Sequence, residues 1–294
     1  MSEFTELETH YQPICLPSGR GGDHESGYPS NLEGKIIRLE ALARLPNSQS
    51  GELVFPKDLF AVSAIREASR LDRYIFLKVV KDLADWRHHG IACPVGVNIA
   101  RLTLSDPDFP SFCAATLIKF RVPPSLICLE ILEQDIFLNR LRMETLEKLR
   151  KIGMSLAVDD AGSGDSTRAI IEKIKPETVK IDQGLVRNLS EKDPLFKRLV
   201  NSPHRPIIIV EGIETSTHDT AVRNRLSSFR WTCGCAFMQG FGYGLPMPAQ
   251  EVTQKLHKQR VKRLYTRSPS RSKAIRPSSG IYNLSNSGDN CRYG

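Results

Sequence analysis

Apolar positions along the chain form short runs that alternate with longer helical patterns. The runs are rich in β-branched residues and predict eight strands, at residues 10–16, 35–42, 93–99, 126–132, 155–160, 177–182, 206–211 and 235–239. Apolar residues recur with helical spacing over residues 60–90, 108–120, 138–153 and 167–174. This alternation predicts a parallel sheet with helical crossovers, and eight strands fit an α/β fold of the (β/α)8 type.

The start of the chain departs from strict strand–helix alternation. Residues 17–34, rich in Gly, Pro and Ser, join the first two predicted strands, and no helical pattern lies between them. We therefore expect an antiparallel pair with an insertion loop at 17–34. The fold class predicted is a TIM-like barrel with one antiparallel strand, and an open doubly wound sheet remains the alternative.

Charge divides the chain at residue 257. Residues 258–294 contain nine Lys or Arg and one acid, so this segment carries the whole formal charge of +8, and residues 1–257 are formally neutral. We expect one barrel domain over 1–257 and a basic, disordered tail over 258–294. The tail lacks a regular aromatic pattern, so we do not expect nucleic acid to be the main ligand.

Cysteine usage and hydropathy indicate a cytoplasmic location. The seven cysteines are odd in number, form no C-x-x-C pair and sit mostly in apolar runs, which is typical of reduced thiols. The polar start MSEFTELETH is unlike a secretory signal, and no apolar run is long enough to cross a membrane.

The candidate chemistry lies where the predicted strands end. Strands of a barrel point their carboxyl ends to one face, where active sites form. Polar residues stand at seven successive strand ends: Glu40, Asn98, Glu130, Asp159 with Asp160, Lys180, Glu211 and Gln239. One acid after a strand is usually a helix cap or a solvated charge. The ordered series is much harder to explain in that way.

Most of these side chains are hard oxygen ligands. Clustered carboxylates repel one another unless a cation lies among them, and oxygen ligands without His or Cys favour Mg²⁺ or Mn²⁺ over zinc. At the end of a strand both Asp159 and Asp160 can face one pocket, so that Asp159 would bridge two ions. Two such ions form a common site for phosphodiester hydrolysis.

These residues stand in motifs that resemble the EAL-domain cyclic di-GMP phosphodiesterases. The signature is Glu40-Ala41-Leu42 within EALARL, preceded by YQPI at 11–14. It is followed in order by VNIA, LEILE, VDDAGSG, VKID, VEGIE and MQGFGYGLPMP, over residues 4–248. The resemblance implies a magnesium- or manganese-dependent, cyclic-guanylate-specific phosphodiesterase that hydrolyses cyclic di-GMP to linear pGpG with metal-activated water.

The resemblance also implies a role for each matching residue. Glu40, Asn98, Glu130 and Asp159 would hold the first metal, and Asp159, Asp160 and Glu211 the second. Lys180 would position the attacking water, assisted by Glu211. Gln12, Arg44 and Gln239 would contact the ligand. Glu133 and Glu214 would support loops of the site: Glu133 the loop after the fifth predicted strand, and Glu214 as part of the matching VEGIE motif.

Several positions depart from the family pattern. In the loop after Asp160, Ala161 and Asp165 replace aromatic residues and Arg168 an apolar one, which removes contact area from a loop that the family uses in homodimerisation. The segment between Lys180 and Glu211 is short, which predicts a clipped helix. A second hypothesis therefore stays open, in which the chain is a catalytically weak or inactive cyclic di-GMP receptor, or a module that binds signalling partner proteins.

Overall fold

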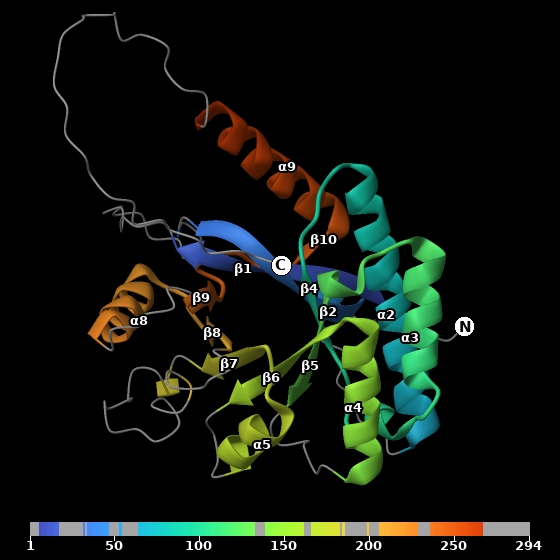
Figure 1. The fold of residues 1–294 in the computed structure, drawn as a ribbon. Coiled ribbons are helices and arrows are strands. Elements are labelled where there is room, and N and C mark those ends of the chain that lie inside the picture. Colours follow the sequence, from blue (N-terminus) through green and yellow to red (C-terminus); the bar gives the residue numbers. More distant parts are fainter. Residues whose placement is uncertain are drawn as a thin grey trace, which may run out of the picture.

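The strands of the computed structural model close into a barrel. The structure describes residues 6–17, 32, 34–46, 53–54, 64–132, 139–161, 166–182, 184–185, 199, 206–228 and 236–266. Eight strands pair in the order β1-β9-β8-β7-β6-β5-β4-β2, and β1 also pairs with β2, which completes the ring (Figure 1). Strand β1 is antiparallel to both neighbours, and the other pairings in the ring are parallel.

The eight barrel strands match the eight predicted runs. Their bounds are β1 Glu8–Pro17, β2 Gly34–Pro46, β4 Val95–Asn98, β5 Ile127–Leu132, β6 Ser155–Ala161, β7 Thr178–Asp182, β8 Ile207–Glu211 and β9 Ala236–Gln239. Two short strands were not predicted: β3 (Leu53–Val54) pairs antiparallel with β2, and β10 (Met247–Pro248) pairs antiparallel with β1. The single antiparallel strand is confirmed. The open-sheet alternative is wrong, because β1 joins β2 to β9.

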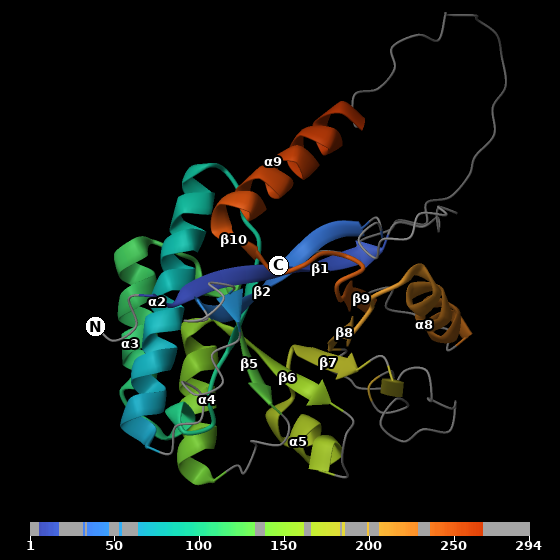
Figure 2. The same ribbon diagram turned by 180° about the vertical axis from the view of Figure 1, so that it is seen from behind.

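Helices cover the outside of this ring. They are α2 (Ile65–His88), α3 (Phe109–Phe120), α4 (Arg140–Ile152), α5 (Ser166–Ile174), α8 (Ser216–Ser228) and α9 (Ala249–Thr266). Helices α2, α3 and α4 stand side by side along one flank, as both ribbon views show (Figures 1 and 2). Their apolar faces pack on the outward side chains of the strands, where the largest buried cluster includes Phe76, Val79 and Leu83 of α2. The helical periodicity therefore encodes the outer core.

Two helices were not among those predicted. Helix α8 lies in the segment between Glu214 and Gln239, and α9 follows β10. Helix α9 runs to Thr266, so the domain boundary predicted at residue 257 falls inside a helix. Buried Val252 and Leu256 are one helical turn apart and fix α9 on the barrel, and no Gly or Pro interrupts the helix after them. Residues 267–294 lie outside the described part of the chain.

Two histidines, His88 and His89, stand at the C-terminal end of α2. The helix ends at His88, and the backbone N–H of His89 donates to the carbonyl oxygen of Asp85 at 3.2 Å. Nδ1 of His89 lies 2.9 Å from the same carbonyl oxygen. Basic side chains near a helix C-terminus are stabilised by the helix dipole, which accounts for this pair without a metal.

Candidate active site

Every barrel strand contributes one polar side chain to the same layer inside the barrel. Side chains alternate along a strand, so the residues two positions away form the layer beneath, where Ile14, Ile209 and Phe237 make a small apolar cluster. The polar layer is buried or half-buried and consists of Gln12, Glu40, Asn98, Glu130, Asp159, Lys180, Glu211 and Gln239. The structure thus brings together all seven predicted strand ends and Gln12.

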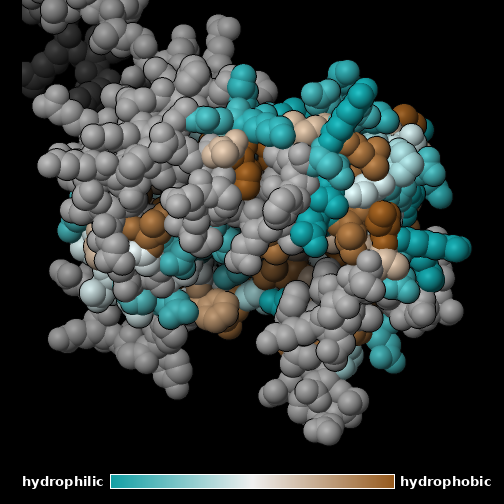
Figure 3. All heavy atoms as spheres, turned by 90° about the horizontal axis from the view of Figure 1, so that it is seen from below, coloured by the Kyte–Doolittle hydropathy of each residue, from teal (hydrophilic) through white to brown (hydrophobic). Residues whose placement is uncertain are grey.

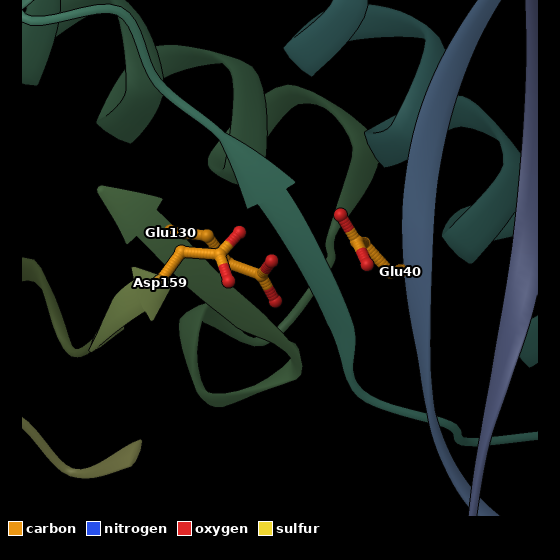
Figure 4. A group of neighbouring side chains, drawn as sticks. All are labelled: Glu40, Glu130 and Asp159. Carbon is orange, nitrogen blue, oxygen red and sulfur yellow. The ribbon is translucent and has the colours of Figure 1, made fainter. Parts of the chain in front are cut away.

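The side chain of Lys180 lies at the centre of this layer. It is 1% exposed, and its ammonium donates to Glu130 at 2.9 Å, Glu40 at 3.1 Å and Asp159 at 3.2 Å. It also forms an ion pair with Oε1 of Glu211 at 2.9 Å. One positive charge therefore serves four carboxylates. In Figure 4 the carboxylates of Glu130 and Asp159 lie next to each other, and Glu40 faces them from β2.

Burial among like charges shifts the acid–base properties of the layer. Burial, reinforced by Glu40 and Asp159, raises the pKa of Glu130 to about 8 against the opposing effect of Lys180. Burial also raises the pKa of Glu211 well above its ordinary value. The pKa of Glu40 is lowered, because Lys180, Gln239 and Asn98 outweigh its burial. The carboxylates thus carry more negative charge than Lys180 alone can stabilise.

The second aspartate reaches the layer through a local change in backbone conformation. Asp160 has a φ of 52°, in the left-handed region, and the pairing of β6 with β7 shifts register between Val158 and Ala161. The backbone N–H of Asp160 donates to Oδ1 of Asp159 at 2.9 Å. This bulge turns two adjacent side chains toward one place, which a regular strand cannot do.

The acidic side chains form two overlapping groups. Ligand oxygens of Glu40, Glu130 and Asp159 lie within 4.8 Å of one another, and so do those of Asp159, Asp160 and Glu211. Asp159 belongs to both groups.

Amide side chains orient one end of this layer. Nε2 of Gln239 donates to Oε2 of Glu40 at 2.5 Å and to Oε1 of Gln12 at 3.2 Å. Nε2 of Gln12 donates to the carbonyl of Gly244 at 3.4 Å. Nδ2 of Asn98 donates to Oε1 of Glu40 at 2.9 Å. Both oxygens of Glu40 are therefore held in place before any ligand arrives.

Comparison with known proteins identifies the family of the chain. The EAL domain family matches residues 3–246. The chain belongs to the EAL domain family. A cyclic di-GMP phosphodiesterase of Escherichia coli, PdeR, is 28% identical over 257 residues, which are 84% of this chain and 35% of that protein. PdeB of Shewanella oneidensis, also named a cyclic di-GMP phosphodiesterase, is 27% identical over 84% of this chain and 27% of its own length. The chain thus spans about a third of these relatives.

Solved EAL structures have the same fold. The phosphodiesterase PaMucR, in complex with c-di-GMP, superposes with a TM-score of 0.65 at 24% identity, over 85% of this chain and 96% of that one. The EAL domain of Mycobacterium smegmatis DcpA gives a TM-score of 0.61 at 23% identity, over 86% and 98% of the two chains. These structures confirm the TIM-like barrel predicted from the sequence.

Other predicted residues of this EAL domain lie at or beyond the edge of the polar layer. Arg44 follows Glu40 by four residues on β2, is half-buried, and donates to the carbonyl of Ala43 at 2.8 Å. Burial lowers the pKa of Arg44, and Glu40 opposes that effect. Glu214 is exposed after β8. Glu133, most of the 17–34 insertion, residues 162–165 and most of the segment predicted to be clipped lie outside the described residues.

One residue of the site was missed from the sequence. Gly96 lies in the middle of β4, and a Cβ atom there would overlap Oε1 of Glu130. Glycine within a strand often marks a place that another group approaches closely, so the run PVGVN carried the signal.

The donor set of the EAL domain suits hard divalent cations. It offers carboxylate and amide oxygens, and among the described residues His and Cys are absent from the polar layer. Cations placed in the two acidic groups would stabilise the ionised forms of Glu130 and Glu211, whose pKa values burial raises. These groups therefore fit the divalent ions that the sequence predicts.

Proposed function

We propose that this chain hydrolyses cyclic di-GMP to linear pGpG with two divalent ions, Mg²⁺ or Mn²⁺. The observation that carries the proposal is the pair of acidic groups that share Asp159. A carboxylate common to two cation sites is a typical feature of two-metal phosphodiester hydrolysis. The names of PdeR and PdeB support the same substrate class.

The residues of the chain would divide the work. Glu40, Asn98, Glu130 and Asp159 would hold one ion, and Asp159, Asp160 and Glu211 the other. The ions, when bound, would lower the pKa of a water molecule and neutralise charge that develops at phosphorus. Lys180 and Glu211 would orient that water. The ion pair between them, at 2.9 Å, gives Lys180 a fixed direction.

Three side chains at the edge of the polar layer would bind the dinucleotide. Gln12 and Gln239 are joined by a hydrogen bond of 3.2 Å, and Oε1 of Gln239 is buried with no hydrogen-bond partner in the structure. A buried acceptor of this kind favours a ligand or water that donates a hydrogen bond. Arg44 would place its positive charge near a phosphate, because it lies on the same face of β2 as Glu40.

The test is conversion of cyclic di-GMP to pGpG by the purified protein, followed by chromatography with Mg²⁺ and with Mn²⁺. Asp159→Asn should lower turnover steeply, because it removes the carboxylate shared by the two groups. The matched control is Asp85→Asn, the same change at an exposed position at the end of α2. Turnover by Asp159→Asn at the rate of the Asp85→Asn control would contradict the mechanism.

The receptor hypothesis rests on the departures at Ala161, Asp165 and Arg168 and on the short segment between Lys180 and Glu211. It predicts that cyclic di-GMP binds with measurable affinity and that no pGpG appears with either metal. Calorimetry and chromatography on the same preparation separate the two functions. The retained acidic groups favour hydrolysis. A homodimer, signalling partner proteins and a cytoplasmic location remain proposals of the sequence, and none of the described helices is long and apolar enough to cross a membrane.

A further inference from the structure

The C-terminal ends of α2 and α3 meet on the side of the barrel opposite the polar layer, and the middle of α9 contacts the end of α2. Helices α2 and α3 run back from the carboxyl end of one strand to the amino end of the next. The side chain of Arg87, in α2, donates to the carbonyl of Arg121, directly after α3. Arg260, in α9, donates to the carbonyl of Gly90 at 2.8 Å. In Figure 1, α2 and α3 end on the side from which α9 extends, and β5 points away from it.

This side of the molecule is strongly basic. We call it the basic end surface and define it by the exposed residues Arg87, His88, His89, Lys119, Arg121, Lys258 and Arg260. Asp85, the acid one turn before His89, lies 3.7 Å from that histidine. Two further basic residues, Lys262 and Arg263, follow along the sequence of α9.

An apolar groove opens between α3 and α4 among these cations. It has a volume of about 400 Å³ and is lined by Leu117, Ile118, Val122, Pro123, Pro124 and Ile152, with Arg121 at its side. Ile118 is 77% exposed, more than any other large apolar residue of the described chain. Figure 3 shows the side of the molecule that lies opposite the basic end surface, which is the side toward which β5 points in Figure 1. An exposed isoleucine between Lys119 and Arg121 combines apolar area with positive charge.

We propose that the basic end surface binds an anionic lipid surface. Cations near an acidic membrane are attracted to its headgroups, and apolar side chains among them enter the interface. The polar layer would then face away from the lipid and stay open to soluble substrate. This contact is peripheral, and it does not depend on which reaction the barrel performs.

The apolar groove favours lipid over nucleic acid as the polyanion. Proteins that bind single-stranded nucleic acid stack bases on exposed aromatic rings. The ring nearest in sequence, Phe120, is partly buried, and the ammonium of Lys119 lies 5.7 Å from its centroid. Ile118 offers exposed aliphatic area instead, which has a use in a lipid interface and little use against a phosphate backbone.

The test is cosedimentation of the full chain with vesicles of phosphatidylcholine alone and with about a third phosphatidylserine. We expect binding to the acidic vesicles only. Lys119→Glu combined with Arg121→Glu should weaken it about a hundredfold or more, because each reversal replaces an attraction with a repulsion. The matched control is Arg66→Glu combined with Arg140→Glu, at the exposed starts of α2 and α4, where binding should be unchanged.

A second variant separates lipid from nucleic acid. Ile118→Asn should weaken binding to acidic vesicles and leave any retention on duplex DNA unchanged. Equal binding by the Lys119/Arg121 and Arg66/Arg140 variants would overturn the proposal, and so would binding to DNA without binding to acidic vesicles. Thermal unfolding and cyclic di-GMP turnover of each variant, both expected to match the unmodified protein, show that a loss of lipid binding is not a loss of fold.

Discussion

Replacing Lys180 with methionine removes the positive charge that four buried carboxylates share. The ammonium is 1% exposed and lies 2.9–3.2 Å from oxygens of all four. Removing one partner of a buried ion pair typically costs about 3–5 kcal/mol. The chain can limit that cost by keeping a proton on one carboxylate, because the pKa of Glu130, about 8, leaves that side chain mostly protonated at pH 7. We therefore expect a loss of about 3–4 kcal/mol in the free energy of unfolding without metal.

This loss should depend on metal and on pH. Divalent ions would replace the missing charge, so saturating Mn²⁺ should shrink the difference between the variant and the unmodified protein. Without Lys180, the pKa values of the buried carboxylates rise further above those of the unfolded chain, because Lys180 now opposes the effect of burial on Glu130 and Glu211. The unfolded state then binds fewer protons at intermediate pH, so the stability of the variant falls as pH rises from about 5 to about 8.

Urea unfolding with a chelator and with Mn²⁺, at several pH values, measures both effects. Lys255→Met is the matched control, because it removes an exposed i,i+4 pair with Glu251 that contributes less than about 1 kcal/mol. If Lys180→Met with chelator at pH 7 loses no more stability than Lys255→Met, then Lys180 does not balance the carboxylates as described.

Three further expectations test other parts of the structure. Burial raises the pKa of Asp72 to about 7. Between about pH 4 and pH 7 the folded state therefore binds a proton that the unfolded state has lost, and the free energy of unfolding falls as pH rises. Asp72→Asn should remove up to about 4 kcal/mol of that pH dependence, measured by urea unfolding. Gly96→Ala should displace Glu130 and weaken Mn²⁺ binding about 10–100-fold by calorimetry, and an unchanged affinity would show that the close approach is not needed. Tyr11→Phe leaves Asp82 without its 2.5 Å hydrogen bond from the tyrosine hydroxyl, so the free energy of unfolding should fall by about 1–3 kcal/mol. An unchanged free energy in urea unfolding would show that water replaces the hydroxyl.

The sequence alone determined which segments are strands and which residues end them. Local apolar patterning encodes both, because a barrel strand buries both faces and a polar residue stands out against its apolar run. The strands themselves can continue beyond that residue, as β2 does from Glu40 to Pro46. Glu40 and Glu130 could therefore be identified as site candidates although they lie 90 positions apart in the sequence and their distance in space was not known. The helices α8 and α9 were not predicted because they contain few apolar positions. Among the side chains described, α9 buries only Val252 and Leu256.

The tertiary structure alone decided how the polar residues meet. Closure of the ring depends on the pairing of β1 with β9 as well as with β2. The missing helical pattern at 17–34 predicted the β1–β2 pair, but no local pattern specifies the β1–β9 pair. The left-handed backbone at Asp160 and the space above Gly96 depend on neighbouring strands. The four contacts of Lys180 come from four different strands. Hydrophobic periodicity reports the local environment of each residue, whereas distances within a site depend on strand order, register and bulges, which are set by long-range pairing.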